Sequence, residues 1–131
     1  MQNEHFESSL FEAVFNSSLD GILVVDHRTG KVRQCNKRFL ELWRIPPDLA
    51  ARRDDDELIG YVLSQLLSPE NFINLVKELY ATPTKSSFDI LHFKDERIFE
   101  RHSEALIINN EVEGRIWYFR DTTEKIRRNE T

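Results

Sequence analysis

The chain has 131 residues, of which 40% are hydrophobic and 31% are charged, and its formal net charge is −5. This length allows one domain with a single core, and the composition is that of a globular protein. Basic residues form no cluster larger than an arginine pair, so nucleic acid is not expected as a partner. The longest apolar run (22–25) is too short to span a membrane, and no signal-peptide pattern is present. With a single cysteine and hence no internal disulfide, these features predict a cytoplasmic domain that does not insert into a membrane.

Residues 3–18 have the spacing of an amphipathic helix with two adjacent apolar stripes. The stripes consist of Phe6, Leu10 and Val14, and of Phe11 and Phe15. Such a helix exposes too much aromatic surface to stand alone. We expect it to cover the sheet, to pair with a second copy, or both, and we predict a homodimer through this helix.

The next segments predict a hairpin and a short helix. A β-branched run at 21–26 and the segment 31–35 are typical of two strands, with the turn closed at Gly30. Asn36 is a candidate N-cap for a helix that the prolines Pro46-Pro47 end.

Two further helices follow in the pattern. Residues 48–67 have helical spacing, interrupted by the charged run 52–57 and by Gly60. Ser68-Pro69 predicts the start of the next helix, with serine as the N-cap and proline at the first helical position. That helix ends at Pro83.

Three strands are predicted at 87–93, 97–108 and 112–120, and their short polar connections indicate an antiparallel meander. Asp121 is then a candidate N-cap for a polar helix, with Glu124 as its capping-box partner. A last strand that leads directly into a polar helix suggests an input module attached to a downstream part.

The chain resembles the PAS sensor domain family over about residues 8–128. The resemblance depends on the segments FNSSLDGI at 15–22, VRQCNKRF at 32–39 and GRIWYFRDTTE at 114–124. The last is similar to the aspartate–aliphatic–threonine ending of PAS domains that precede a signalling helix, except that Thr122 occupies the aliphatic position. The subtype resembles those of bacterial sensor histidine kinases and diguanylate cyclases.

This resemblance implies an α+β fold: a five-stranded antiparallel sheet in the order 2-1-5-4-3, with helices on one face around a small pocket. It divides the chain into an N-terminal helix (1–18), a PAS domain (19–121) and the start of a signalling helix (122–131). It also implies a non-catalytic module that dimerises through the first helix and passes a signal to a downstream effector. Asp121, Thr123 and Glu124 are the expected signal-transmission residues, and no catalytic residues are predicted.

The pocket wall in this family comes from the apolar helical residues. The corresponding residues here are Phe39, Leu42, Trp43, Phe72, Leu75 and Val76, although a filled core needs the same residues. Two alternatives therefore stay open: a ligand-free structural PAS domain that serves only dimerisation, and a small α+β enzyme such as a hotdog thioesterase.

No cofactor or metal is predicted, and a small ligand of unknown identity is left open. Cys35 lies in a segment that resembles a flavin-binding motif, but the order of the residues and the place of the segment in the chain differ. We therefore expect Cys35 to be a small buried hydrophobic residue. The helix that offers a haem ligand in other PAS domains contains no histidine here. His92 and His102 either face each other across neighbouring strands or lie separately on the sheet surface. The charged run 52–57 lacks the ligand spacing of a calcium loop, and neither haem nor flavin is expected.

Overall fold

The computed structural model describes residues 2–130. Met1 of the predicted N-terminal segment and Thr131 of the predicted signalling segment lie outside the described part. The elements in chain order are α1 (Gln2–Ser17), β1 (Gly21–Asp26), β2 (Val32–Cys35), α2 (Lys37–Leu42), α3 (Pro47–Arg52), α4 (Asp55–Ser64), α5 (Pro69–Ala81), β3 (Ser87–His92), β4 (Ile98–Ile108), β5 (Glu111–Asp121) and α6 (Thr123–Glu130).

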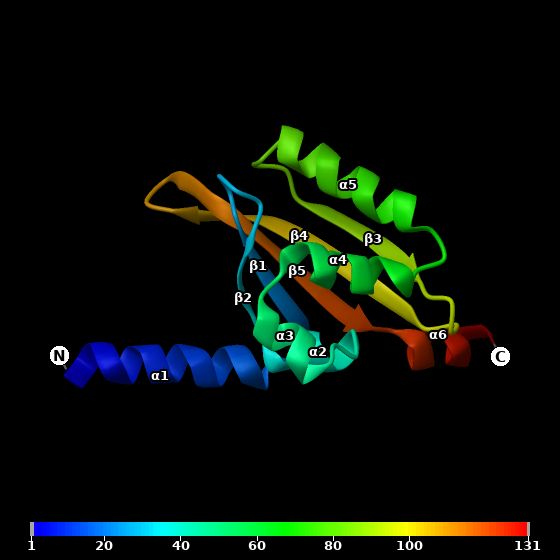
Figure 1. The fold of residues 1–131 in the computed structure, drawn as a ribbon, viewed down its shortest axis with the longest axis horizontal. Coiled ribbons are helices and arrows are strands. Elements are labelled where there is room, and N and C mark those ends of the chain that lie inside the picture. Colours follow the sequence, from blue (N-terminus) through cyan, green and yellow to red (C-terminus); the bar gives the residue numbers. More distant parts are fainter. Residues whose placement is uncertain (1, 131) are drawn as a thin grey trace.

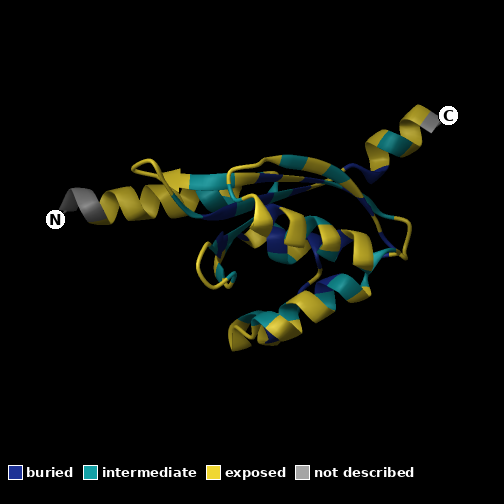
Figure 2. Ribbon diagram, turned by 90° about the horizontal axis from the view of Figure 1, so that it is seen from above, coloured by how far each residue is buried: buried dark blue, intermediate teal, exposed yellow. Residues whose placement is uncertain are grey.

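The five strands form one antiparallel sheet in the order β2-β1-β5-β4-β3, which confirms the predicted fold. Helices α2 to α5 pack on one face of the sheet (Figure 2). Helices α1 and α6 project from opposite ends of the molecule (Figure 1). The chain therefore enters and leaves the domain through two exposed helices.

The meander is closed by turns whose residues suit their backbone. Asn109 and Asn110 both have positive φ, 53° and 66°, as a two-residue type I′ hairpin requires. Asparagine tolerates this conformation better than most residues. At the β1–β2 turn, Asp26 Oδ2 accepts hydrogen bonds from the amides of Arg28 and Thr29, and Gly30 has a φ of 70°.

The core lies between the sheet and these helices, and its centre is Trp43, which has no exposed surface. Ring centroids of surrounding phenylalanines lie 5.0–6.5 Å from that of Trp43. These rings belong to Phe39, Phe72, Phe93, Phe99 and Phe119. Residues from α2, α5, β4 and β5, together with Phe93 just after β3, thus meet at one indole, and the area they remove from water stabilises the fold.

The helix boundaries confirm some predicted caps and correct others. Asn36 caps α2 as predicted, since its side chain accepts a hydrogen bond from the Phe39 amide. The single segment expected at 48–67 is divided at Arg53, which has a φ of 53°, and Asp54 caps α4 by accepting from the amides of Asp56 and Glu57. Gly60 does not interrupt this helix.

Two other helix boundaries were predicted wrongly, namely the cap at the start of α5 and the residue at which α2 ends. Ser68 makes no side-chain capping bond, so Pro69 alone marks the start of α5. Helix α2 ends at Leu42, before the prolines, and Pro47 begins α3. Proline suits the first helical position because the amide it lacks would have no partner there.

Candidate functional site

A cavity of about 250 Å³ lies between the inner face of the sheet and helices α4 and α5. Among the predicted pocket residues, Phe39, Trp43, Phe72 and Val76 line it. Leu42 and Leu75 are not among its lining residues. Leu42 is buried with its Cδ1 3.0 Å from the point where a Cβ on Gly21 would lie, and Leu75 packs half-buried against the core.

The part of the cavity wall that the sheet, α4 and two further positions of α5 provide was not predicted from the sequence. These further residues include Leu23, Val25, Val32, Leu58, Ile59, Val62, Ile73, Tyr80, Trp117 and Phe119. The period-two pattern of β5 could have identified two of them, because alternate residues of a strand share one face. Trp117 pairs with Leu23 and Phe119 with Gly21 on β1, and both aromatic side chains point to the core.

Tyr80 and Asp55 are two of the polar residues that line the cavity. Tyr80 extends from α5 toward the β1–β2 turn, where a Cβ on Gly30 would lie 3.1 Å from its hydroxyl oxygen. Burial raises the pKa of this hydroxyl, against the opposing charge of Arg115, so it stays protonated at neutral pH. Asp55 Oδ2 accepts a 2.8 Å hydrogen bond from the Val32 amide, which ties the start of α4 to β2.

The junction between β5 and α6 is a network of hydrogen bonds around Ile98, at the start of β4. The Ile98 amide donates to Thr123 Oγ1 over 2.9 Å, and the Ile98 carbonyl accepts from the Thr122 amide over 2.9 Å and its hydroxyl over 3.1 Å. Thr123 Oγ1 in turn donates to Asp121 Oδ1 over 2.6 Å. Both threonines are buried, so the root of α6 is fixed to β4 as well as to its own strand.

The predicted capping box does not form at this junction. Asp121 accepts from the Thr123 amide, as an aspartate near a helix start does, but α6 begins at Thr123, two residues after Asp121, so Asp121 does not directly precede the helix. The Glu124 side chain is exposed, and the hydrogen bonds of the junction join Asp121, Thr122, Thr123 and Ile98. Asp121 and Thr123 belong to the junction network, and Glu124 lies outside it.

The five predicted dimer residues lie on α1, where all but Phe15 are exposed. Phe11 and Phe15 stack with ring centroids 5.4 Å apart. Among the residues that the structure describes, the hydrogen bonds between this helix and the domain come from its C-terminal end: Asn36 Nδ2 donates to the Phe15 carbonyl, and the Lys37 amide donates to Asn16 Oδ1. The apolar stripe of α1 is therefore held out to solvent from a fixed root.

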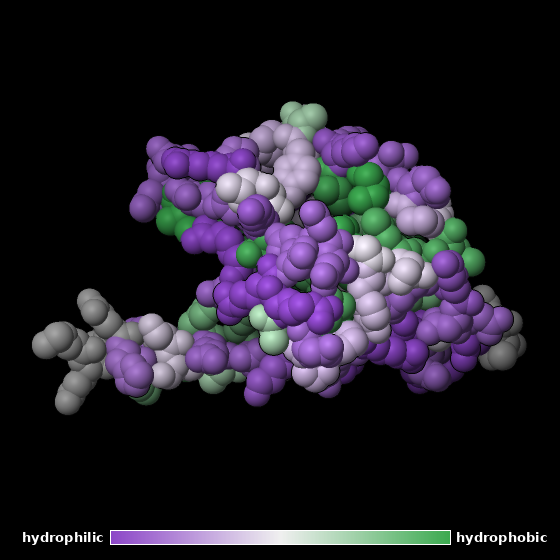
Figure 3. Space-filling model, in the orientation of Figure 1, coloured by the Kyte–Doolittle hydropathy of each residue, from purple (hydrophilic) through white to green (hydrophobic). Residues whose placement is uncertain are grey.

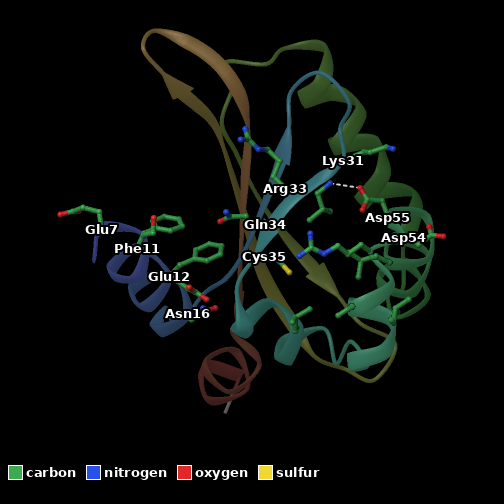
Figure 4. A pocket seen from close by; sticks show the side chains of 18 residues that line it. Glu7, Phe11, Glu12, Asn16, Lys31, Arg33, Gln34, Cys35, Asp54 and Asp55 are labelled. Atoms are coloured by element: carbon green, nitrogen blue, oxygen red, sulfur yellow. Dashed lines mark hydrogen bonds between the residues drawn. The ribbon is translucent and has the colours of Figure 1, made fainter. Parts of the chain in front are cut away.

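A groove of about 1000 Å³ opens between α1, β2 and the start of α4. Figure 3 shows the corresponding notch above α1, and Figure 4 shows the groove itself, with Phe11 and Glu12 on the α1 side and Arg33 and Cys35 on β2. Burial raises the pKa of the Cys35 thiol, with an opposing effect from Arg53, so the thiol stays protonated at neutral pH.

Of the two arrangements considered for His92 and His102, the strand register excludes the facing pair and confirms two separate histidines. His102 pairs with Phe88, and His92 pairs with Ile98, so the two histidines lie at different positions along the same face. The imidazole of His102 packs edge-on against Phe88, with centroids 5.1 Å apart. Both histidines are separate residues of the exposed sheet surface.

Within residues 2–130, no helix is both long and apolar enough to cross a membrane.

The strand order and the one-sided layer of helices define an α+β domain that encloses a cavity against its sheet. Residues 9–79, more than half of the chain, match the family model for the PAS domain. The chain belongs to the PAS domain family, whose fold is in general sensory and non-catalytic. Comparison with curated protein sequences gave no match.

Solved structures share this fold at low sequence identity. The sensor region of a sensor histidine kinase has a TM-score of 0.62 and 18% identity; the match covers 82% of this chain but only 41% of the other. The PAS domain of Bordetella pertussis BvgS has a TM-score of 0.62 and 15% identity, with 95% and 94% covered. The PAS domain of an HTR-like protein from Haloarcula marismortui has a TM-score of 0.60 and 21% identity, with 92% and 95% covered. The hotdog alternative is excluded by this fold.

Proposed function

We propose that the chain is the sensory module of a larger bacterial signalling protein, such as a sensor histidine kinase or a diguanylate cyclase. It works in the cytoplasm, catalyses no reaction itself, and passes a change in its cavity to a downstream effector. This proposal is supported by the family and by one feature of the site: β5 both lines the cavity and leads into α6.

The path along β5 is short. Trp117 and Phe119 line the cavity, and Asp121, two residues after Phe119, bonds to Thr123 at the start of α6. A molecule that prefers one arrangement of this wall shifts the population of the domain toward it. Because α6 is fixed to the end of the same strand, the helix direction changes with the wall.

Asp121→Ala in the full-length protein tests this path. Loss of the cap costs about 1 kcal/mol, a substantial part of a switching equilibrium, so we expect the effector's response to its stimulus to fall. Asp121→Asn is the matched control, because its side-chain oxygen still accepts from the Thr123 amide. If Asp121→Ala leaves both the basal output and the response unchanged, the proposed transmission is wrong.

The cavity favours a small, uncharged and largely apolar ligand. Its volume of about 250 Å³ is below the roughly 300–1,000 Å³ of sites for drug-sized molecules. A dry cavity of about 150 Å³ already holds benzene in another protein. Among its lining residues there is no lysine, arginine or histidine, whereas Asp55 and Asp56 are present, so an anion finds no cationic partner there.

Toluene and benzoate form a matched pair of probes for this preference. We expect toluene to shift the NMR signals of Val62, Val76 and Trp117, and benzoate to bind at least about tenfold more weakly because its charge would have to be desolvated. Native mass spectrometry of freshly purified protein adds a direct search for a retained ligand. If neither probe binds and only the bare protein mass is found, the ligand-free structural alternative is favoured instead.

A homodimer through α1 is the second part of the proposal. It is supported by the exposed Phe6, Leu10 and Val14, and by the charges around the groove, where Glu7 and Glu12 of α1 lie opposite Lys31 and Arg33. In a twofold dimer each set of charges could meet its complement on the other copy.

Light scattering tests this interface. Changing Phe6, Leu10 and Val14 together to serine should give a monomer, whereas Phe88→Ser with Ile90→Ser, on the exposed sheet face, should leave the dimer intact. The opposite pattern would place the interface on the sheet.

A further inference from the structure

Arg97 makes several side-chain hydrogen bonds that the path along β5 does not use. Its Nη1 donates to the Leu42 carbonyl over 2.7 Å, its Nη2 to Gln65 Oε1 over 2.8 Å, and its Nε to Asp95 over 2.9 Å. The guanidinium lies over the ring of Phe93, 4.4 Å from its centroid. Only 13% of the Arg97 side chain is exposed, so these bonds are largely shielded from water.

On one side, these bonds reach the cavity wall. Leu42 and Trp43 form the C-terminal end of α2, and Trp43 lines the cavity. Gln65, at the C-terminal end of α4, donates from Nε2 to the Trp43 carbonyl over 2.8 Å while it accepts from Arg97. Arg97 and Gln65 thus supply the partners that the last carbonyls of a helix lack. We call Arg97, Gln65 and the carbonyls of Leu42 and Trp43 the clamp.

On its other side, the clamp is one residue away in the chain from Ile98, which bonds to the root of the exit helix. Ile98, which follows Arg97, accepts from Thr122 and donates to Thr123 at the root of α6. The Arg97 guanidinium therefore holds the ends of α2 and α4, while the Arg97 backbone is joined directly to the Ile98 peptide. Its planar fork of donors can hold several acceptors at once, which a lysine cannot.

We infer that the clamp is a second route from the cavity to α6, through β4 rather than β5, with Arg97 as the positioning residue. The inference rests on the proposed sensory function and adds how the site is coupled. Displacement of the Trp43 end of α2 alters the bonds at Gln65 and Arg97, and the Ile98 peptide and the junction threonines follow.

Amide hydrogen exchange on the whole chain tests the clamp without a ligand. The reporters are the amides of Thr122, Thr123 and Ile126, which bond to Ile98, Asp121 and Thr122. The reference is the Asn36 amide, which bonds to the Ile22 carbonyl at the other side of the sheet. We expect Gln65→Leu to speed exchange of the reporters about five- to tenfold, a factor that corresponds to the net contribution of one hydrogen bond to stability. We expect exchange of the reference to stay unchanged.

Gln65 is the decisive position because its hydrogen bonds go to Trp43, Arg97, Val62 and Lys94, all outside the junction. Arg97→Met should give at least the same effect, and the double variant no more than Arg97→Met alone, since both changes break one network. Gln34→Leu, at an exposed glutamine of β2, is the matched control and should leave exchange as in the native protein.

Three results would overturn the inference: native exchange of the reporters in Gln65→Leu, an equal rise in the reporters and the reference, or full additivity in the double variant. The second would mean that the clamp stabilises the fold as a whole without directing motion to α6. These outcomes are separable from the Asp121→Ala experiment. If that variant loses its response while both clamp variants leave the reporters unchanged, the module signals through β5 alone.

Discussion

Helices α1 and α6 are the two elements that project from the domain, and they are attached in opposite ways. Helix α1 carries an exposed apolar stripe and is tied down through the Phe15 carbonyl and the Asn16 side chain of its last turn. Helix α6 is polar, with an apolar side chain only at Ile126, but its root is buried and bonded to a neighbouring strand. Helix α1 therefore presents an apolar surface, whereas α6 leaves the domain in a fixed direction.

This difference separates two tasks that both helices could otherwise share. An isolated helix of this length is marginal in water, so the free part of α1 gains stability from whatever covers its stripe. Helix α6 has little to gain from burial, and its orientation depends on the few bonds at Asp121, Thr122 and Thr123. We therefore expect changes on α1 to affect association, and changes at the root of α6 to affect stability and coupling.

The largest effect is expected at the root of α1. Asn36 is fully buried and makes four side-chain hydrogen bonds, to the Ile22 and Phe39 amides and to the Phe15 and Asp20 carbonyls. Asn36→Ala should lower the free energy of unfolding by about 3 kcal/mol, because buried groups lose their partners together with the cap. Urea unfolding measures this. Asn16→Ala, which removes one exposed bond, should cost less than about 1 kcal/mol, and equal losses would contradict this reading.

The root of α6 permits a matched pair of substitutions. Thr123→Val leaves the Ile98 amide without its acceptor and should cost about 1–2 kcal/mol. Thr122→Val should cost less than about 0.5 kcal/mol, because the Ile98 carbonyl keeps its bond from the Thr122 amide. Thermal or urea unfolding compares the two. A larger loss at Thr122 would show that threonine in the aliphatic position is itself important for the junction.

A smaller, pH-dependent effect is expected at Asp95, beside the clamp. Burial alone would raise the pKa of this carboxyl, but the hydrogen bonds and charge of Arg97 outweigh it and hold the pKa below 3.8. Because the folded pKa is the lower one, the stabilisation is complete above 3.8 and is lost as the pH falls through the folded value.

Asp95→Asn should therefore melt at a lower temperature than the native protein near neutral pH, and the difference should shrink as the pH falls through the lowered pKa of Asp95. Calorimetry across this range provides the measurement. Asp26, whose pKa is lowered by hydrogen bonds from the Thr29 amide and its neighbours, is present in both proteins and so cancels in the comparison. A difference that stays constant with pH would exclude a contribution from the charge of Asp95.

The smallest effect on stability is expected on the surface of α1. Phe6→Ser or Val14→Ser should change the unfolding free energy of the monomer by less than about 0.5 kcal/mol, since both side chains are more than half exposed. Phe72→Ser, at a buried phenylalanine of α5, should cost at least about 3 kcal/mol. A large loss at Phe6 in the monomer would mean that the stripe already packs within its own chain.

Local chemistry made much of the fold predictable. The strand segments, the Asn36 cap and the start of α5 at Pro69 depend on residues close together in sequence, and they lie within a residue or two of where they were expected. The cavity was predictable only in part. Helical periodicity identified Phe39, Trp43, Phe72 and Val76, whereas the sheet wall required the pairing of β1 with β5, which joins residues nearly a hundred positions apart.

By itself the sequence determined the order of the elements, the family and the polar character of the exit helix, because periodicity, turn residues and local motifs carry that information. The tertiary structure alone decided which of the apolar helical residues face the cavity, that His92 and His102 do not meet, and that Glu124 stays outside the junction. It also brought Gln65, Arg97 and Ile98 together between the cavity and α6. Such contacts depend on strand register and on the packing of distant segments, and the amino-acid sequence contains no local signal for either.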